Sequence, residues 1–142
     1  MSKVIDLTQS NIENRIFVFR NTPVMIDKDL AEMYQVETKV LNQAVKRNIV
    51  RFPEEFRFRL NDFEKLELVT NCDRFALLKH SSNNPHAFTE QGIAMLSAVL
   101  RSDVAIKVSI QIINAFVQMR KVVNFNAYLL QRIEGVERKQ IE

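Results

Sequence analysis

Residues 38–47 constrain the fold more than any other stretch, because helical spacing sorts them into two chemically distinct faces. The apolar face would hold Val40, Leu41, Ala44 and Val45. The opposite face would hold Lys39, Asn42, Gln43, Lys46 and Arg47. An ordinary solvated helix face mixes carboxylates with its lysines, whereas this face has amides and cations and no acid. The pattern indicates a surface that meets phosphates and base edges.

The distribution of charge supports this interpretation better than the total. The formal net charge is only +3, but six basic and two acidic residues lie between positions 39 and 59, a local balance of +4 that leaves −1 for the rest. The six are Lys39, Lys46, Arg47, Arg51, Arg57 and Arg59. A concentrated positive patch attracts a phosphate backbone and steers encounter with it.

Length and composition favour one globular domain with a helical tail. The chain has 142 residues, of which 46% are apolar and 26% charged, and this balance argues against disorder. The apolar runs are too short to cross a bilayer, and the first residues lack a signal-peptide pattern, so we expect a cytoplasmic protein without a membrane partner. A single cysteine, Cys72, cannot form an internal disulfide, which agrees with a reducing compartment.

The first half of the chain predicts a hairpin followed by a helix-turn-helix. Two β-branched and aromatic runs at 16–20 and 24–26 are separated by a loop at 21–23 that contains proline. Asp27 is a suitable N-cap for a helix to Tyr34, and after a four-residue link Thr38 can cap a second helix to about Asn48. Two short helices joined in this way, with the polar face on the second, are typical of a helix-turn-helix.

The second half predicts further strands and then helices. Strict alternation at 56–60 favours a strand whose Arg57 and Arg59 face outward together. Asn61 and Glu64 have capping-box spacing for a helix at 62–69. A strand is expected at 75–78, a short extended piece at 87–88, and a helix from Thr89 to 100. The fold class is therefore α+β: a small β-hairpin or sheet with an embedded helix-turn-helix, followed by C-terminal helices.

The last forty residues predict a long helix with an interaction role. It would start at Ser102 or Asp103 and run at least to 121, and its apolar content on nearly all sides suggests burial on two sides, one of them against a partner subunit. Leu129, Ile133 and Val136 have the 4-3 spacing of a short coiled-coil seam. We expect a homodimer through residues 103–142.

Several long motifs, in order along the chain, resemble the KilA-N/antirepressor-type DNA-binding domain of phages and bacteria, of the ORF-six N-terminal type. They are VMIDKDLAEMY (24–34), ETKVLNQAVKRN (37–48), RFP (51–53) and AFTEQG (87–92). The resemblance implies a small α+β domain at residues 10–121 that binds DNA, typically in phage antirepressors and prophage regulators. Residues 122–142 would then be a helical tail, for dimerisation or as a linker.

The chain departs from this family pattern at two places. Family members tend to have glycine where this chain has Gln35, and a residue with positive φ there would cost about 1 kcal/mol relative to glycine. The stretch between Val69 and Ala87 lacks the glycines of the family's loop, so no contact is carried over to it.

Catalytic and cofactor chemistry find little support in the sequence. Cys72, His80 and His86 have the spacing of no common zinc site and lack a fourth ligand, and nothing marks Cys72 as an activated thiol. With two glycines, the chain has no phosphate-cradling loop. A nuclease would need a carboxylate or histidine cluster that cannot be assembled here. We therefore expect no enzyme activity, no cofactor, no metal and no small-molecule substrate.

The sequence predicts specific binding of double-stranded DNA by a prophage-type transcriptional regulator, with helix 38–48 in the major groove. Specificity would come mainly from Asn42, Gln43 and Arg47, and affinity mainly from the basic residues. The candidate site comprises Thr38, Lys39, Asn42, Gln43, Lys46, Arg47, Arg51, Arg57 and Arg59. The alternative is a protein-interaction module that binds another regulator, such as a repressor, through its C-terminal helices.

Overall fold

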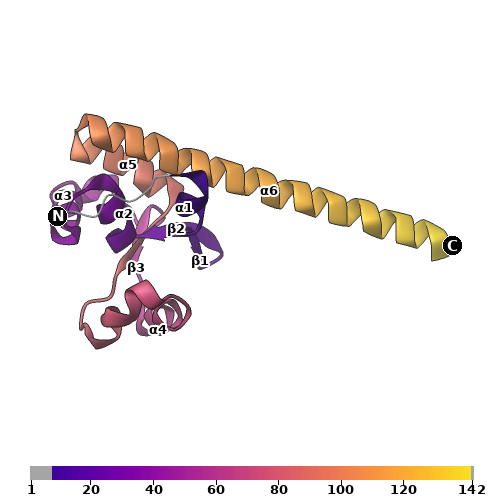
Figure 1. The fold of residues 1–142 in the computed structure, drawn as a ribbon, viewed down its shortest axis with the longest axis horizontal. Coiled ribbons are helices and arrows are strands. Elements are labelled where there is room, and N and C mark those ends of the chain that lie inside the picture. Colours follow the sequence, from indigo (N-terminus) through magenta and orange to yellow (C-terminus); the bar gives the residue numbers. More distant parts are fainter. Residues whose placement is uncertain (1–7, 142) are drawn as a thin grey trace.

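The computed structural model describes residues 8–141, except for the side chains of residues 9–10, 123–125, 127 and 134–141 (Figure 1). Its elements are α1 (Gln9–Glu13), β1 (Phe17–Phe19), β2 (Thr22–Ile26), α2 (Asp27–Tyr34), α3 (Thr38–Arg47), η1 (Ile49–Arg51), β3 (Arg57–Arg59), α4 (Asp62–Asn71), η2 (Asp73–His80), β4 (His86–Phe88), α5 (Glu90–Leu100) and α6 (Asp103–Ile141), where η denotes a 3-10 helix. The strands form one antiparallel sheet in the order β1-β2-β4-β3. The expected α+β class is confirmed.

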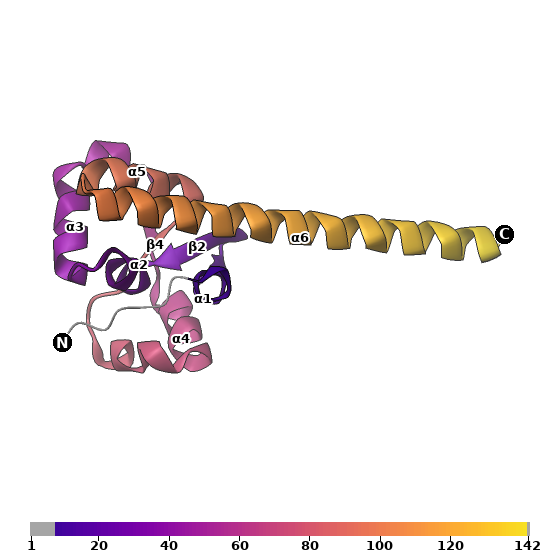
Figure 2. The ribbon, with the colours of Figure 1, turned by 45° about the horizontal axis from the view of Figure 1, so that its top comes forward.

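The sheet separates two apolar cores (Figure 2). Side chains alternate across it, so Met25 faces the core formed with α1, α2, α3, α5 and α6, whereas Val24 and Ile26 face the smaller core under α4 and η2. In β4, Phe88 lies in the first core and Ala87 in the second. Burial on both faces explains why these strands are almost continuously apolar.

The hairpin turn lies one residue earlier than the sequence predicted. Arg20 and Asn21 form a tight turn with φ of 54° and 60°, and Thr22 and Pro23 belong to β2 instead of the loop. Two positive-φ residues give the backbone twist that a two-residue hairpin needs. Pro23 is tolerated because β4 pairs only with Met25 and residue 26, so the missing N–H removes no bond on that side.

Three of the expected helix starts are confirmed by their capping bonds. The Glu64 backbone N donates to Asn61 Oδ1 at 2.8 Å and the Asn61 backbone N donates to Glu64 Oε1 at 2.9 Å, which completes the capping box. Thr89 Oγ1 accepts from the N–H of residue 92 at 3.4 Å, and Ser102 Oγ accepts from Ala105 at 3.0 Å.

The other two expected caps are wrong. Asp27 and Thr38 are the first residues of their helices, and the N-cap residues Ile26 and Glu37 make no side-chain cap bond. The Asp27 carboxylate accepts from the Lys28 backbone N at 2.8 Å and also binds groups from α3 and β4.

The expected strand at 75–78 is also wrong, because this stretch is part of η2. Only Phe75 and Leu78 contact the smaller core, whereas Leu77 is exposed. A spacing of three residues between the buried side chains matches the period of a 3-10 helix. The apolar run resembled a strand, but its burial does not alternate.

Helix α6 packs on the domain with one face only. Ala105, Val108 and Ile112 are buried, whereas Ile106 and Ile110 on the other side are 48% and 55% exposed. Burial on two sides is therefore not found within the single chain. Beyond the domain the helix continues to residue 141 and projects away from it (Figures 1 and 2). None of the helices within residues 8–141 combines the length and apolar character that a membrane span requires.

Gln35 ends α2 in the left-handed conformation, with φ 60° and ψ 42°. Its N–H donates to the Glu32 carbonyl at 3.2 Å and the Val36 N–H donates to the Ala31 carbonyl at 3.0 Å, which is a Schellman cap normally formed by glycine. We therefore expect Gln35→Gly to raise the free energy of unfolding by about 1 kcal/mol, measured by urea denaturation. Gln35→Ala retains the strained backbone and should give no such gain; equal stability of the two variants would contradict the argument.

Candidate nucleic-acid interface

Helix α3 is held against the domain by two fully buried side chains on one face. Leu41 and Val45 lie in the larger core together with Leu30 and Tyr34 of α2. Residues 35–37 connect the two helices, and α3 also contacts α5. The packing leaves the opposite face of α3 at one end of the molecule, far from the C-terminus of α6 (Figure 1).

A buried hydrogen bond fastens α2 to the long helix. Tyr34 Oη and Ser109 Oγ lie 2.6 Å apart in the core. Burial raises the pKa of Tyr34 to about 12, although the bond to Ser109 opposes this shift, so the phenol stays protonated. Helix α2 therefore supports α3 from a fixed position on α6.

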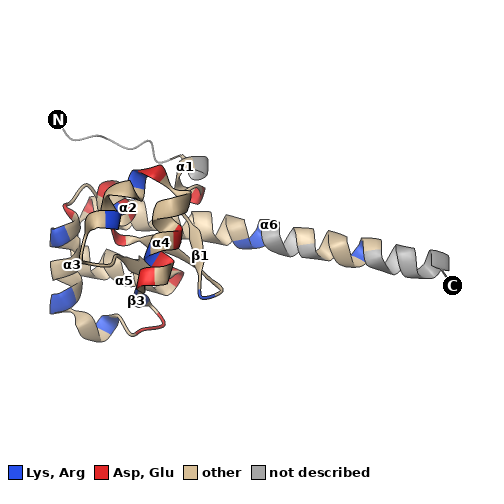
Figure 3. Ribbon diagram, turned by 90° about the horizontal axis from the view of Figure 1, so that it is seen from below, with Lys and Arg blue, Asp and Glu red and all other residues tan. Residues whose placement is uncertain are grey.

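The exposed face of α3 is basic and contains no acid (Figure 3). Lys39, Gln43, Lys46 and Arg47 are all exposed, and Arg51 of the following η1 is exposed as well. Among the side chains that the structure describes, none of these cations takes part in an ion pair. Val40 was expected on the apolar side but is 46% exposed, so the exposed face of α3 is wider than the sequence suggested and includes one apolar side chain.

Asn42 does not share this exposure. It is half-buried, and its Nδ2 donates to Asp27 Oδ2 at 3.0 Å. The same carboxylate oxygen accepts from the His86 backbone N at 3.3 Å, so Asp27 joins α2, α3 and β4. Asn42 Oδ1 is buried without a partner among the described groups. The outward amide expected from helical spacing is thus turned toward α2, where it helps to fix the angle between the helices.

The two arginines of β3 also differ from each other. They lie on one side of the strand, as the alternation predicted, and Arg59 is exposed. Arg57 is half-buried, with its guanidinium carbon 5.6 Å from the centre of the Phe88 ring. Burial lowers the pKa of Arg57, partly opposed by the nearby Asp27. Only Arg59 fully meets the expectation that both arginines face outward.

A groove of about 560 Å³ joins the start of α3 to β3. Thr38, Lys39 and Asn42 line one side of it, and Arg59 lines another. The remaining wall comes from α2 and from the polar stretch before β4: Asp27, Lys28, Leu78, Ser81, Asn83, Asn84, Pro85 and His86. The structure thus brings Arg59 next to the α3 residues. Sequence reasoning missed this wall, because nothing in residues 79–85 beyond their polarity marks them as neighbours of α3.

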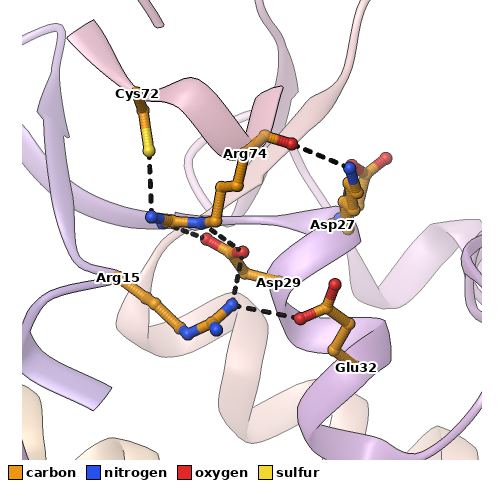
Figure 4. A network of polar contacts seen from close by, with 7 residues as sticks. Arg15, Asp27, Asp29, Glu32, Cys72 and Arg74 are labelled. Atoms are coloured by element: carbon orange, nitrogen blue, oxygen red, sulfur yellow. Dashed lines mark hydrogen bonds and ion pairs between the residues drawn. The ribbon is translucent and has the colours of Figure 1, made fainter. Parts of the chain in front are cut away.

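A buried ion-pair network holds α2 in place (Figure 4). Asp29, which is 1% exposed, accepts two bonds from Arg74 at 2.8 and 3.0 Å and one from Arg15 at 2.8 Å. Arg15 also contacts the exposed Glu32 at 3.2 Å. Burial alone would lower the pKa of Arg74, but its bonds to Asp29 raise it above the ordinary value. No sequence signal links these residues, since they are separated by up to 45 positions.

The three residues once considered as zinc ligands lie in different surroundings. Cys72 Sγ is 2.9 Å from Arg74 Nη1, His86 Nδ1 is 3.8 Å from Asp27, and His80 is exposed. Within the described part of the chain, no group of three or more His, Cys, Asp or Glu side chains is placed to hold a metal ion.

The comparisons with known proteins give one finding. Residues 14–99 match the ORF6N domain, which is more than half of the chain and includes β1 to α5. No curated protein and no solved structure matches. ORF6N is a phage regulatory domain that is related to KilA-N and antirepressor proteins and is generally non-catalytic. The chain therefore belongs to the ORF6N domain family.

Proposed function

We propose that this chain binds double-stranded DNA in a sequence-specific manner, as a non-enzymatic regulator, with α2 and α3 acting as a helix-turn-helix. One observation carries the proposal: the exposed face of α3 holds Lys39, Gln43, Lys46 and Arg47 without any acid or ion-pair partner among the described side chains. Unpaired cations on one helix are suited to phosphates, and an amide beside an arginine is suited to base edges.

The roles follow from side-chain geometry. Gln43 can bond adenine N6 and N7 together, and Arg47 can bond guanine O6 and N7; each good pair contributes about 1–3 kcal/mol of discrimination. Thr38 lies at the start of α3 and would contact phosphate. Four cations flank these residues and would bind the phosphate backbone of DNA on both sides of its major groove: Lys39, Lys46, Arg51 and Arg59.

Two of the residues first chosen for DNA contact take different roles. Asn42 is held by Asp27 and would set the angle of α3 instead of contacting a base. Arg57 is half-buried over Phe88. Its charge would add to the positive potential around Arg59 that attracts DNA, without direct contact. Specificity thus depends on Gln43 and Arg47.

Binding to a random duplex pool tests the electrostatic part of the proposal, and selection of the bound sequences from that pool tests its specificity. With about five phosphate contacts, affinity should fall between about 10²- and 10³-fold from 50 to 200 mM salt, measured by fluorescence anisotropy. Lys46→Ala combined with Arg47→Ala should weaken binding roughly 10- to 100-fold and make the salt dependence shallower.

The matched control removes the same charge elsewhere. Arg120 and Lys121 are also adjacent and exposed, but they lie on α6 away from α3. Changing both to alanine should leave affinity within about two-fold because both residues lie away from α3, and loss of the surface ion pair Arg120–Glu90 should cost little stability. Equal losses in the two double variants would mean that binding follows net charge and not the α3 surface.

A second function is favoured by one specific observation. Ile106 and Ile110 leave an apolar stripe exposed on the part of α6 that packs on the domain. Such a stripe is suited to another regulator, such as a repressor protein. Absence of any DNA shift, together with co-purification of a protein that is lost in Ile106→Lys with Ile110→Lys, would favour this alternative.

A further inference from the structure

The C-terminal part of α6 presents apolar residues that no other part of the described chain covers. Every described side chain from Val122 to Ile133 is exposed, including Leu129 at 43% and Ile133 at 55%. The helix nevertheless continues to residue 141 (Figure 2). Helices in proteins owe most of their stability to packing of an apolar face, so this stretch needs a partner.

The apolar residues follow a heptad pattern. With Asn126 and Ile133 at position a, Val122, Leu129 and Val136 fall at position d. β-branched residues at a with leucine at d favour two-stranded coils. Ile133 at a and Leu129 at d are of these types, whereas the exposed Tyr128 and Leu130 lie outside the seam.

The polar residue of this seam specifies the partner and its direction. An asparagine at position a finds its complement in the same asparagine of a parallel, in-register second copy, and an antiparallel partner would face it with a d-position side chain instead.

The seam overlaps the edge of the stripe that faces the domain. At 100° per residue it is centred roughly a sixth of a turn from Ala105, Val108, Ile112 and Ala115. Asn126 and Ile133 are in line with the buried Val108 and Ala115, whereas Val122 and Leu129 are in line with the exposed Val104 and Gln111. A second helix would therefore contact α6 beyond Lys121 and pass along the edge of the domain.

We propose that residues 122–141 form a parallel, two-stranded coiled coil between two copies of this chain. Both domains then lie at the same end of the coil. Because α3 lies at the end of the domain opposite to the C-terminus of α6, both α3 surfaces point away from the coil (Figures 1 and 2). Two such surfaces fit paired half-sites on DNA.

Sizing of the full chain without DNA tests the dimer, and its result is independent of the proposed DNA binding. Sedimentation equilibrium should show a dimer for the parent chain. Leu129→Lys with Ile133→Lys should raise the dissociation constant at least about 100-fold, because each of the two chains loses two buried apolar side chains and gains two charges. A monomeric parent chain at all accessible concentrations would overturn the proposal.

A matched pair of substitutions identifies the face. Ile106 and Ile110 have the same spacing and similar exposure on the same helix, but they lie on the far side from the seam. Ile106→Lys with Ile110→Lys should leave the dimer intact. Dissociation in this variant, or persistence of the dimer in the Leu129 and Ile133 variant, would place the interface elsewhere.

A cysteine at the core position tests direction and register. In a Cys72→Ser background, Asn126→Cys should form a disulfide between copies on mild oxidation, because parallel a positions face each other. A dimer that does not cross-link at this position would overturn the parallel arrangement.

Discussion

Asp29→Asn is expected to lower the free energy of unfolding by about 3–5 kcal/mol, the largest loss of any single substitution considered for this domain. Asp29 is buried at the first turn of α2 and accepts bonds from two guanidinium groups that come from opposite sides, Arg15 and Arg74. Asparagine keeps the shape of the side chain but removes its charge, so Arg74 would remain partly buried without a counter-ion and Arg15 would keep only the exposed Glu32.

The expected loss in the free energy of unfolding comes from buried cations that lose their carboxylate partner. It does not measure how much the whole network stabilises the fold. A buried ion pair often contributes little compared with apolar residues of the same shape, whereas removal of one member leaves an uncompensated charge. Arg74 has further contacts that would be left intact: its guanidinium lies 4.7 Å from the centre of the Phe75 ring and 2.9 Å from Cys72 Sγ. Its charge would therefore stay at this site after the substitution.

Glu32→Gln provides the control. It removes a carboxylate from the same network, but the Glu32 side chain is exposed, and its bond to Arg15 is 3.2 Å long. A change within about 0.5 kcal/mol is expected in urea denaturation. If Asp29→Asn costs no more than Glu32→Gln, the network does not hold α2, and the support of α3 has to come from the apolar core alone.

The parts of the fold that could be predicted from the sequence are those decided by neighbouring residues. The capping box at Asn61 and Glu64, the cap at Thr89 and the buried pair Leu41 and Val45 each depend on positions only three or four residues apart. Local spacing determines such features, so a pattern in the sequence is enough to find them.

The two failures in the candidate site have a common physical cause, which is contact between distant parts of the chain. Helical spacing places Asn42 on the polar face, but a carboxylate from α2, fifteen residues away, holds the amide. Alternation places Arg57 beside Arg59, but Phe88 from the adjacent strand partly covers it. The exposure of the polar face of α3 could therefore be predicted from spacing, whereas the orientation of its half-buried members required the structure. The contact of this face with DNA stays a prediction.

Gly92→Ala is expected to lower the free energy of unfolding by about 2–3 kcal/mol, although alanine is the better helix former. A Cβ at this position of α5 would lie 2.2 Å from the Phe56 carbonyl oxygen. That oxygen belongs to the backbone and also accepts bonds from the Thr89 backbone N at 3.0 Å and from Thr89 Oγ1 at 3.2 Å. Phe56 thus cannot move away without loss of its bonds to Thr89, the N-cap residue of α5. The clash can therefore be removed only at the cost of these bonds.

Ala94→Gly makes the opposite substitution on the same helix. It separates the effect of the clash with the Phe56 carbonyl from the effect of helix propensity. Ala94 is exposed, so its replacement by glycine should cost about 1 kcal/mol through propensity alone. Alanine should therefore be the more stable residue at position 94 and the less stable one at position 92, in parallel urea denaturation curves. A Gly92→Ala variant as stable as the parent would mean that α5 does not pack against residue 56. The strand β3, which carries Arg59 to the α3 surface, would then be held by its pairing with β4 without this contact.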